Sequence, residues 1–335
     1  MGLTSYCQRL GKECKVMAKR NSLAYSLTHN KNVNSIENER TKKQYVEKIR
    51  MFAKFLKEEC GIKRIEQIKG KEKEYLQMYE RKLEADDKTP ATIHTYMAAC
   101  CKAVDVKLDE IDKPIRKAST IIRSRDANKN RQGKAEMEKE ENQKLVMFQK
   151  AVGIRRDELK HLKNDNLKRD ENGYLCVEVL KGKGGKYQLQ RVASEDEAFV
   201  KSYFDGSKDK VFTKEQMDNK IDLHSIRSAN AREKYEYYLK RIETEPKYRE
   251  QLRKECLDRF DARHKGDDKY NHKRDRFIRD MDERRPYIVR GDNRKIAKEK
   301  GYPTEYNRLA IMAVSVFHLS HWRTNVAVTN YMLAG

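Results

Sequence analysis

The sequence predicts a mainly α-helical protein with a small antiparallel β-sheet, divided between two domains. Three observations support this prediction. The chain has 335 residues, which is too long for a single domain with one hydrophobic core and fits two domains. Apolar residues recur at spacings of three and four in several segments, as they do on one face of a helix. One central stretch alternates apolar and polar residues on both sides of a glycine-rich turn, which is typical of a β-hairpin.

The N-terminal part of the chain predicts an arm followed by a helical domain. Residues 1–35 are polar and lack a strong period, so we expect an arm or a short helix there. Residues 36–113 are expected to be helical, and the first helix begins near Thr41. Its apolar face carries Tyr45, Ile49, Phe52 and Leu56. Its other face carries Lys42, Lys43, Lys48, Arg50 and Lys54.

Two more helices complete this domain, and a basic segment follows. The second helix is expected at about Lys71–Leu83, and the third begins at Thr89–Pro90, an N-cap followed by proline at the first helical position. Residues 114–142 are basic and lack an apolar stripe, which predicts an extended linker. Such a linker either lies along a phosphate backbone or is a plain flexible connection.

Residues 143–335 are expected to form the second domain. It opens with a helix through Val146, Phe148 and Val152. A turn at Asn172–Gly173, an alternating strand and the GKGG turn at 182–185 then predict a hairpin with lysines at its tip. From Glu195 onward we expect mainly helices.

A highly charged segment interrupts this domain at about residues 240–300. Its apolar residues are sparse, and it contains no repeat and no sustained heptad. Two interpretations stay open. The segment is either a solvated helical hairpin inserted into the domain, or an insertion that contacts DNA or another subunit.

The charge of the chain favours a polyanionic partner. Lys and Arg number 75 against 53 Asp and Glu, which gives a net charge of +22. A surplus of this size attracts nucleic acid, although a highly charged soluble protein or a protein that binds acidic membranes has a similar composition. No secretory signal is visible, and the longest apolar run, Leu309–Leu319, is too short to span a bilayer. We therefore expect a cytoplasmic, nucleoid-associated protein without a membrane partner.

The cysteines do not indicate a metal site. The seven cysteines form no CxxC pair, and their odd number argues against a disulfide framework. We expect structural or incidental roles for all of them, and neither a metal nor a cofactor.

Four blocks carry residues suited to breaking a phosphodiester bond. That reaction needs a nucleophile, positive charge around the phosphate and a proton donor for the leaving oxygen. Arginine holds two phosphate oxygens at once, while lysine and histidine can transfer protons. The blocks are GIRRDEL (153–159), KGKGGK (181–186), HSIR (224–227) and LSHWRTNVAVTNY (319–331).

Together and in this order, the four blocks resemble those of the tyrosine recombinase (phage integrase) family. GIRRDEL is similar to the family's GLRxSEL block, GKGGK to its hairpin GKGxK, HSIR to H-x-x-R, and the last block to LGHxxxxxTxxxY. The segment TPATIHTYMAA also looks like part of the family's core-binding domain. The resemblance implies an N-terminal helical core-binding (SAM-like) domain and an α/β catalytic domain.

The resemblance also implies roles for individual residues. The catalytic set would be Arg155, Lys183, His224, Arg227, His321 and the nucleophile Tyr331, with Glu158 as an acidic support. Both arginines and His321 would bind the scissile phosphate, His224 would assist proton removal from Tyr331, and Lys183 would protonate the leaving oxygen. Lys181 and Lys186 are the other candidates for that last role. The expected DNA-binding residues are Lys43, Lys48, Arg50, Lys54, Lys181, Lys186 and Arg323.

The implied activity is site-specific integration or excision of a mobile element through a 3′-phosphotyrosyl link, without a metal. The partners would be double-stranded DNA and other copies of the chain, a dimer on one site and a tetramer in synapsis. The chain departs from the family in the long charged segment between Arg227 and His321, and in a His321–Tyr331 spacing one residue longer than is common. Type IB topoisomerase activity and a non-catalytic DNA-binding regulator are the alternatives.

Overall fold

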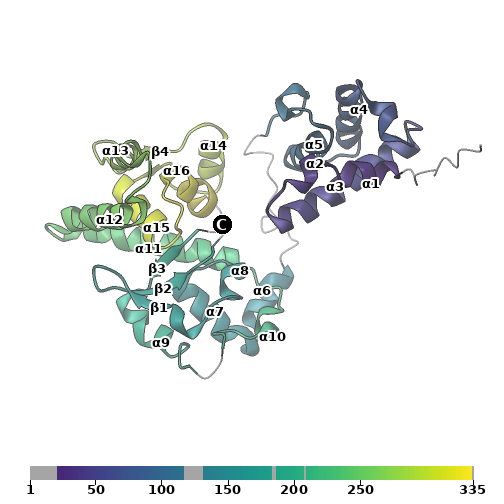
Figure 1. Ribbon diagram of the computed structural model, residues 1–335. Coiled ribbons are helices and arrows are strands. Elements are labelled where there is room, and N and C mark those ends of the chain that lie inside the picture. Colours follow the sequence, from purple (N-terminus) through teal and green to yellow (C-terminus); the bar gives the residue numbers. More distant parts are fainter. Residues whose placement is uncertain (1–20, 117–130, 183–185, 207–208, 334–335) are drawn as a thin grey trace, which may run out of the picture. The chain divides into compact units, whose positions relative to one another are not determined.

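The structure is a computed structural model that describes residues 21–116, 131–182, 186–206 and 209–333. The chain divides into two compact units, Met1–Ile121 and Ile122–Gly335. Figure 1 labels the elements of both units. The prediction of a mainly helical protein with a small antiparallel sheet is confirmed.

Unit 1 is entirely helical within its described residues. Its elements are α1 (Leu23–Thr28), α2 (Lys31–Asn34), α3 (Glu39–Glu58), the 3₁₀ turn η1 (Ile65–Ile68), α4 (Glu72–Ala85), α5 (Pro90–Val104) and η2 (Leu108–Glu110). The threonine side chain at position 89 caps α5, as the sequence predicted. The apolar faces of α3, α4 and α5 meet in one core, which contains Phe52, Leu76 and Met97.

The second half of the N-terminal segment, where the sequence predicted an arm or a short helix, forms two short helices that pack into unit 1. Residues 23–34 form α1 and α2, and their side chains Leu23, Leu27 and Val33 are buried in the core of unit 1. The Asn30 amide donates a hydrogen bond of 2.8 Å to the carbonyl of Ala103 in α5. The arm could not be separated from the domain by pattern because these helices are too short to repeat an apolar period. Residues 1–20 lie outside the described residues.

The predicted linker also ends earlier than expected. Residues 131–138 form α6 (Arg131–Glu138), which precedes α7 (Glu140–Val152). The central part of the predicted linker, residues 117–130, lies outside the described residues.

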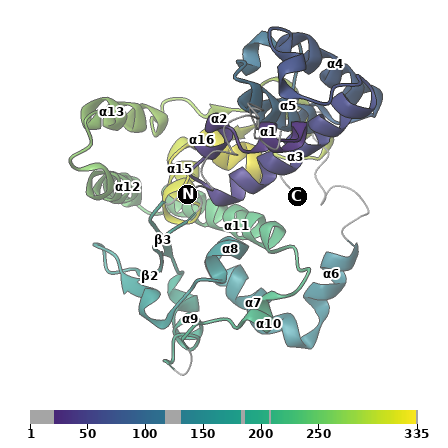
Figure 2. The ribbon, with the colours of Figure 1, turned by 45° about the vertical axis from the view of Figure 1, so that its right-hand side comes forward.

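Unit 2 combines a three-stranded sheet with several layers of helices (Figures 1 and 2). Its strands are β1 (Leu167–Arg169), β2 (Leu175–Val179), β3 (Gln188–Arg191), β4 (Tyr287–Ile288) and β5 (Glu305–Tyr306). Its larger helices are α7, α11 (Leu223–Thr244), α12 (Tyr248–His264), α13 (Tyr270–Asp280), α14 (Gly291–Glu299) and α15 (Arg308–Phe317). The shorter elements are α8 (Arg156–Leu159), η5 (Asn164–Asn166), η6 (Ser194–Asp196), α9 (Glu197–Lys201), α10 (Lys214–Met217), α16 (Thr324–Ala327) and η7 (Val328–Met332).

The predicted hairpin is confirmed as β2 and β3, which pair antiparallel in the order β1-β2-β3. All five residues of β2 are buried, so both of its faces are covered. Strand β1 was not predicted, because a three-residue strand with one apolar residue shows no alternation. The pair β4–β5 is likewise too short to be recognised from sequence.

The charged segment at 240–300 packs into the core of unit 2 and is not a solvated hairpin. Leu252, Cys256 and Phe260 of α12 and Phe277 of α13 are buried together with the fully buried helix α15. Helix α12 packs against α15, and α13 packs against α12 (Figure 2). Within the described part of the chain, no helix is long and apolar enough to cross a membrane.

Candidate active site

A basic groove of about 1370 Å³ runs along one side of unit 2. Its wall is formed by residues from the start of α8, the end of the hairpin, the start of α11, the end of α12, and the segment that follows α15. Six lysine or arginine residues line it: Arg155, Arg156, Lys186, Arg227, Arg263 and Arg323. Asp222 is the one acidic residue among the described residues of this wall. Such a groove favours an anionic ligand.

Arg155 is held at the edge of the groove by Glu158. The carboxylate of Glu158 accepts hydrogen bonds from the backbone N–H of Arg155 at 2.9 Å and from its Nη1 at 2.6 Å. Gln188 of β3 donates to the same carboxylate at 2.8 Å. Burial raises the pKa of Glu158, but the attraction of Arg155 and Arg227 outweighs it, so its pKa is lowered. The carboxylate is therefore charged and fixes the direction of the guanidinium.

The opposite end of the same guanidinium reaches the last block of the sequence. Nη2 of Arg155 lies 3.2 Å from Nε2 of His321, and that Nε2 lies 2.9 Å from the hydroxyl of Tyr331. Tyr331 belongs to η7, a π-helical turn, and only 3% of the residue is exposed. Because a guanidinium can only donate, the ring nitrogen facing it acts as an acceptor, and the tyrosine hydroxyl donates to it. This places the proton of Tyr331 within reach of an unprotonated histidine nitrogen.

Arg227 is completely buried beneath Tyr331. Its guanidinium donates to the carbonyl of Gly153, and through Nη2 to the carbonyl of Leu319 at 2.9 Å. It therefore ties together the two backbone segments that carry Arg155 and His321. Burial lowers the pKa of Arg227, and attraction to Tyr331 opposes this. The Cζ atom lies 5.5 Å from the centre of the Tyr331 ring, close enough to stabilise a phenolate.

This burial differs from the role expected for Arg227 as a direct phosphate ligand. Two of its donors are already used by backbone carbonyls, whereas Nε has no hydrogen-bond partner among the described residues. The sequence could not reveal this because a buried arginine and an exposed one look alike in an H-x-x-R pattern.

His224 lies at the start of α11, beside the nucleophile candidate. Its ring centre is 5.3 Å from that of Tyr331. The side chain of Asp222 caps this helix by accepting from the backbone N–H groups of His224 and Ser225. Nε2 of His321 is within hydrogen-bond distance of the Tyr331 hydroxyl, whereas His224 was the residue expected to take its proton.

The hairpin tip carries the lysine candidates, and Lys183 itself lies outside the described residues. The turn is closed by a 2.8 Å hydrogen bond from the N–H of Gly182 to the carbonyl of Lys186. Both Lys181 and Lys186 are exposed, and Lys186 lines the groove. Gly182 packs so tightly that a Cβ atom there would lie 1.7 Å from Nε2 of Gln188.

The remaining DNA-binding candidates are partly dispersed. Lys43, Arg50 and Lys54 share one exposed face of α3, opposite its buried residues. Lys48 lies elsewhere on the helix, with its Nζ 5.6 Å from the centre of the Tyr96 ring. Arg323 is exposed on the wall of the groove.

Several groove residues were not predicted. Gln188 bonds to both Arg155 and Glu158, and Arg156 donates to Asn219 and to two backbone carbonyls before α11. The inward position of Gln188 carried no signal, because alternation in YQLQRV places the apolar Tyr187 and Leu189 on the side expected to be buried, whereas Gln188 and Gln190 are the buried residues. Trp322 and Arg263 carried no signal in the sequence, since their proximity depends on the packing of α12.

Among the described residues, no group of three or more His, Cys, Asp or Glu side chains could hold a metal ion. Comparisons with protein-family models, with curated proteins and with solved structures found no match to this chain.

Proposed function

We propose that this protein is a tyrosine-type site-specific DNA recombinase, which cuts and rejoins strands through a covalent link to Tyr331. The observation that carries this proposal is the chain of contacts Arg155–His321–Tyr331 inside a groove lined by six basic side chains. A phenol beside a histidine acceptor and an arginine is suited to attack a phosphodiester. The order of the four sequence blocks supports the same class of reaction.

In the proposed reaction, the oxygen of Tyr331 attacks the phosphorus atom while its proton passes to Nε2 of His321. The bond between phosphorus and the 5′-oxygen breaks, which leaves a 3′-phosphotyrosyl link. The departing 5′-oxygen takes a proton from the hairpin lysine, Lys183, with Lys186 as the alternative. Arg155 neutralises the phosphate oxygens, and Arg227 stabilises the phenolate from below.

His321 is the proposed first proton acceptor because its Nε2 lies 2.9 Å from the hydroxyl of Tyr331. An imidazolium at His321 would lie 3.2 Å from the cation of Arg155, which is unfavourable in the free protein. A phosphate bound between these two groups offsets the repulsion. Tyr331 is therefore activated only when DNA occupies the groove.

The link conserves the energy of the phosphodiester, so a 5′-hydroxyl of a partner duplex can reverse the reaction. The proposal includes assembly of several copies on two DNA sites, nucleoid association, and contact between DNA and the lysine and arginine face of α3. A type IB topoisomerase would use the same chemistry within one duplex.

The test uses a suicide duplex with a 5′-bridging phosphorothiolate, carrying sites selected from random DNA by binding. We expect the wild-type chain to form a covalent adduct in the presence of EDTA, and Tyr331→Phe to form none. Tyr302→Phe, a change in a partly buried tyrosine outside the groove, serves as the matched control. Absence of an adduct on tightly bound DNA would contradict catalysis and favour a DNA-binding regulator. Relaxation of supercoils without strand exchange would favour the topoisomerase.

A further inference from the structure

We propose that the inserted helices α12 and α13 are a positioning device for the active site, and that they act on His321 by holding Trp322. This inference rests on the proposed function, because it assigns a role in the same reaction. It concerns a segment that the resemblance to recombinases does not account for.

The backbone on both sides of His321 is in an unfavourable conformation. Ser320 has a φ of 52° and Trp322 a φ of 59°, both in the left-handed region that side chains other than glycine rarely adopt. A bulky residue stays in this region only where its surroundings hold it there. The direction of the His321 ring, and hence its contact with Tyr331, depends on these two residues.

The surroundings that hold Trp322 come from the insertion. Its ring centre lies 6.2 Å from that of Phe260 and 5.8 Å from that of His264, both in α12. The ring of Phe277 in α13 lies 6.1 Å away. The guanidinium of Arg263 covers the indole, with Cζ 5.2 Å from its centre. Four side chains of the insertion therefore surround Trp322, which lies next to His321 in the catalytic loop, the segment between α15 and α16.

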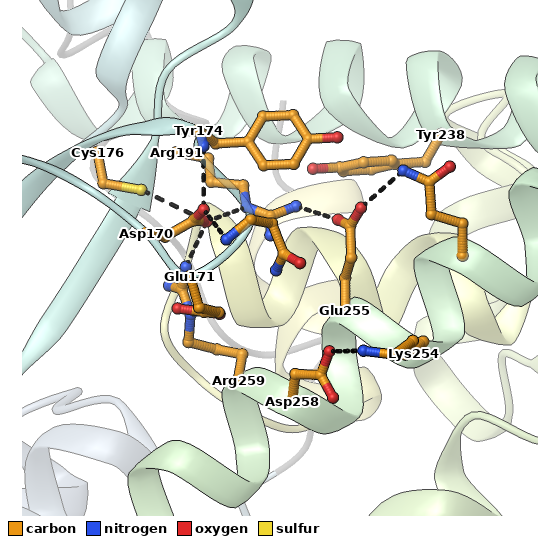
Figure 3. A network of polar contacts seen from close by, with 12 residues as sticks. Asp170, Glu171, Tyr174, Cys176, Arg191, Tyr238, Lys254, Glu255, Asp258 and Arg259 are labelled. Atoms are coloured by element: carbon orange, nitrogen blue, oxygen red, sulfur yellow. Dashed lines mark hydrogen bonds and ion pairs between the residues drawn. The ribbon is translucent and has the colours of Figure 1, made fainter.

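Helix α12 can serve as a fixed support because buried ion pairs attach it to the sheet (Figure 3). Glu255 accepts from Arg191 of β3 at 2.6 Å, and Arg259 donates to Asp170 at 2.6 Å. Arg191 also donates to Asp170 at 2.7 Å, and all four side chains are at most 7% exposed. Breaking such pairs is strongly unfavourable, so the network resists displacement of the helix.

These contacts connect the sheet to the nucleophile Tyr331 through α12, Trp322 and His321. One face of α12 is fixed to β3, and its last turn fixes Trp322, next to the histidine that contacts Tyr331. Trp322 is therefore a positioning residue. The charged insertion stands where recombinases have a short connection, and its role is to support the catalytic loop.

The experiment measures cleavage of the suicide duplex in a single turnover at saturating DNA, together with duplex affinity in a Tyr331→Phe background. The variants are Trp322→Gly, which accepts the backbone conformation but removes the indole, and Trp322→Phe, which keeps an aromatic ring. Each is combined with His321→Ala in a double-mutant cycle. The matched control is Tyr302→Ala, which removes another partly buried ring from the same core.

We expect Trp322→Gly to slow cleavage at saturating DNA about 10- to 100-fold, a rate that a change in duplex affinity does not affect, since small displacements of a reacting group have effects of this size. Trp322→Phe should restore most of the rate. In the His321→Ala background, Trp322→Gly should cause no further slowing. Equal slowing in both backgrounds, or none in either, would overturn the inference while leaving the proposed function intact.

A second readout separates this inference from the proposed function. If the wild-type chain forms no adduct, the proposed function fails, and NMR signals of the His321 ring then decide the positioning role. The inference predicts that these signals move in Trp322→Gly and stay in place in Tyr302→Ala. Unchanged signals in Trp322→Gly would overturn it.

Discussion

Replacing Glu158 by glutamine removes one negative charge from beneath Arg155 while keeping the size of the side chain. The carboxylate is 3% exposed and accepts three hydrogen bonds, two from Arg155 and one from Gln188. A glutamine offers one acceptor and turns an amide N–H toward the other donors, so at least one contact becomes repulsive.

The expected loss of stability follows from this geometry. Breaking a buried ion pair by removing one partner costs about 3–5 kcal/mol, but Arg155 is 20% exposed, so solvent recovers part of that. We expect Glu158→Gln to lower the free energy of unfolding by about 2–4 kcal/mol at neutral pH. Its rate of adduct formation should fall about 10- to 100-fold because Arg155 loses its fixed direction.

The pH dependence of the stability difference between wild type and Glu158→Gln gives a second check on the role of the Glu158 carboxylate. The pKa of Glu158 is lowered in the folded state, so its stabilising contribution is complete above the unfolded value of about 4.3. This contribution is lost as the pH falls through the lower folded value. The difference in stability between wild type and Glu158→Gln should therefore be largest near neutral pH and shrink in acid.

Urea unfolding at several pH values measures both quantities. The matched control is Glu141→Gln, whose side chain is 74% exposed and which should cost less than about 1 kcal/mol. The reasoning is refuted if Glu158→Gln is no more destabilising than Glu141→Gln, or if its effect is the same at acid and neutral pH.

Three further predictions follow from the packing of unit 2. Gly182→Ala should slow adduct formation with little effect on DNA affinity, because the new methyl group displaces Gln188, and single-turnover cleavage would detect it. Asp170→Asn should lower the free energy of unfolding by about 3–5 kcal/mol, since two buried guanidinium groups each lose one of their two carboxylate partners; Lys254→Gln, a change at an exposed side chain that should cost under about 1 kcal/mol, is the control in urea titrations. Burial holds the pKa of His318 well below its usual value, so stability should fall by about 1.4 kcal/mol per pH unit below about pH 6.5, and His318→Gln should flatten that slope. Equal pH slopes in wild type and His318→Gln would contradict the last of these.

Local patterns in the sequence sufficed for the elements that carry strong signals. Helix α5 begins where Thr89 and Pro90 predicted, and β2–β3 form the hairpin that alternation and GKGG predicted. Strands of two or three residues, such as β1 and β4, were missed because they are too short to show alternation.

The inserted helices were misjudged for a different reason. Glu255 and Arg259 suggest a solvated surface in the sequence, yet they are buried because Arg191 and Asp170 neutralise them from distant parts of the chain. Charge pairing of this kind depends on tertiary contacts, so no local pattern predicts it.

The candidate site was foreseen in its residue types but not in its arrangement. Arg155, Arg227, His321 and Tyr331 were named from three separate blocks, and they lie together in unit 2. The burial of Arg227 and the pairing of Tyr331 with His321 depend on the backbone path after α15, which the sequence does not specify.

The most direct measurement identifies the residue that becomes attached to DNA. The adduct from the suicide duplex would be digested with nuclease and protease, and the peptide that retains a nucleotide would be sequenced by mass spectrometry. The account predicts a nucleotide on Tyr331 through its 3′-phosphate. A nucleotide on another residue, or a free 3′-hydroxyl beside a 5′-linked adduct, would contradict it.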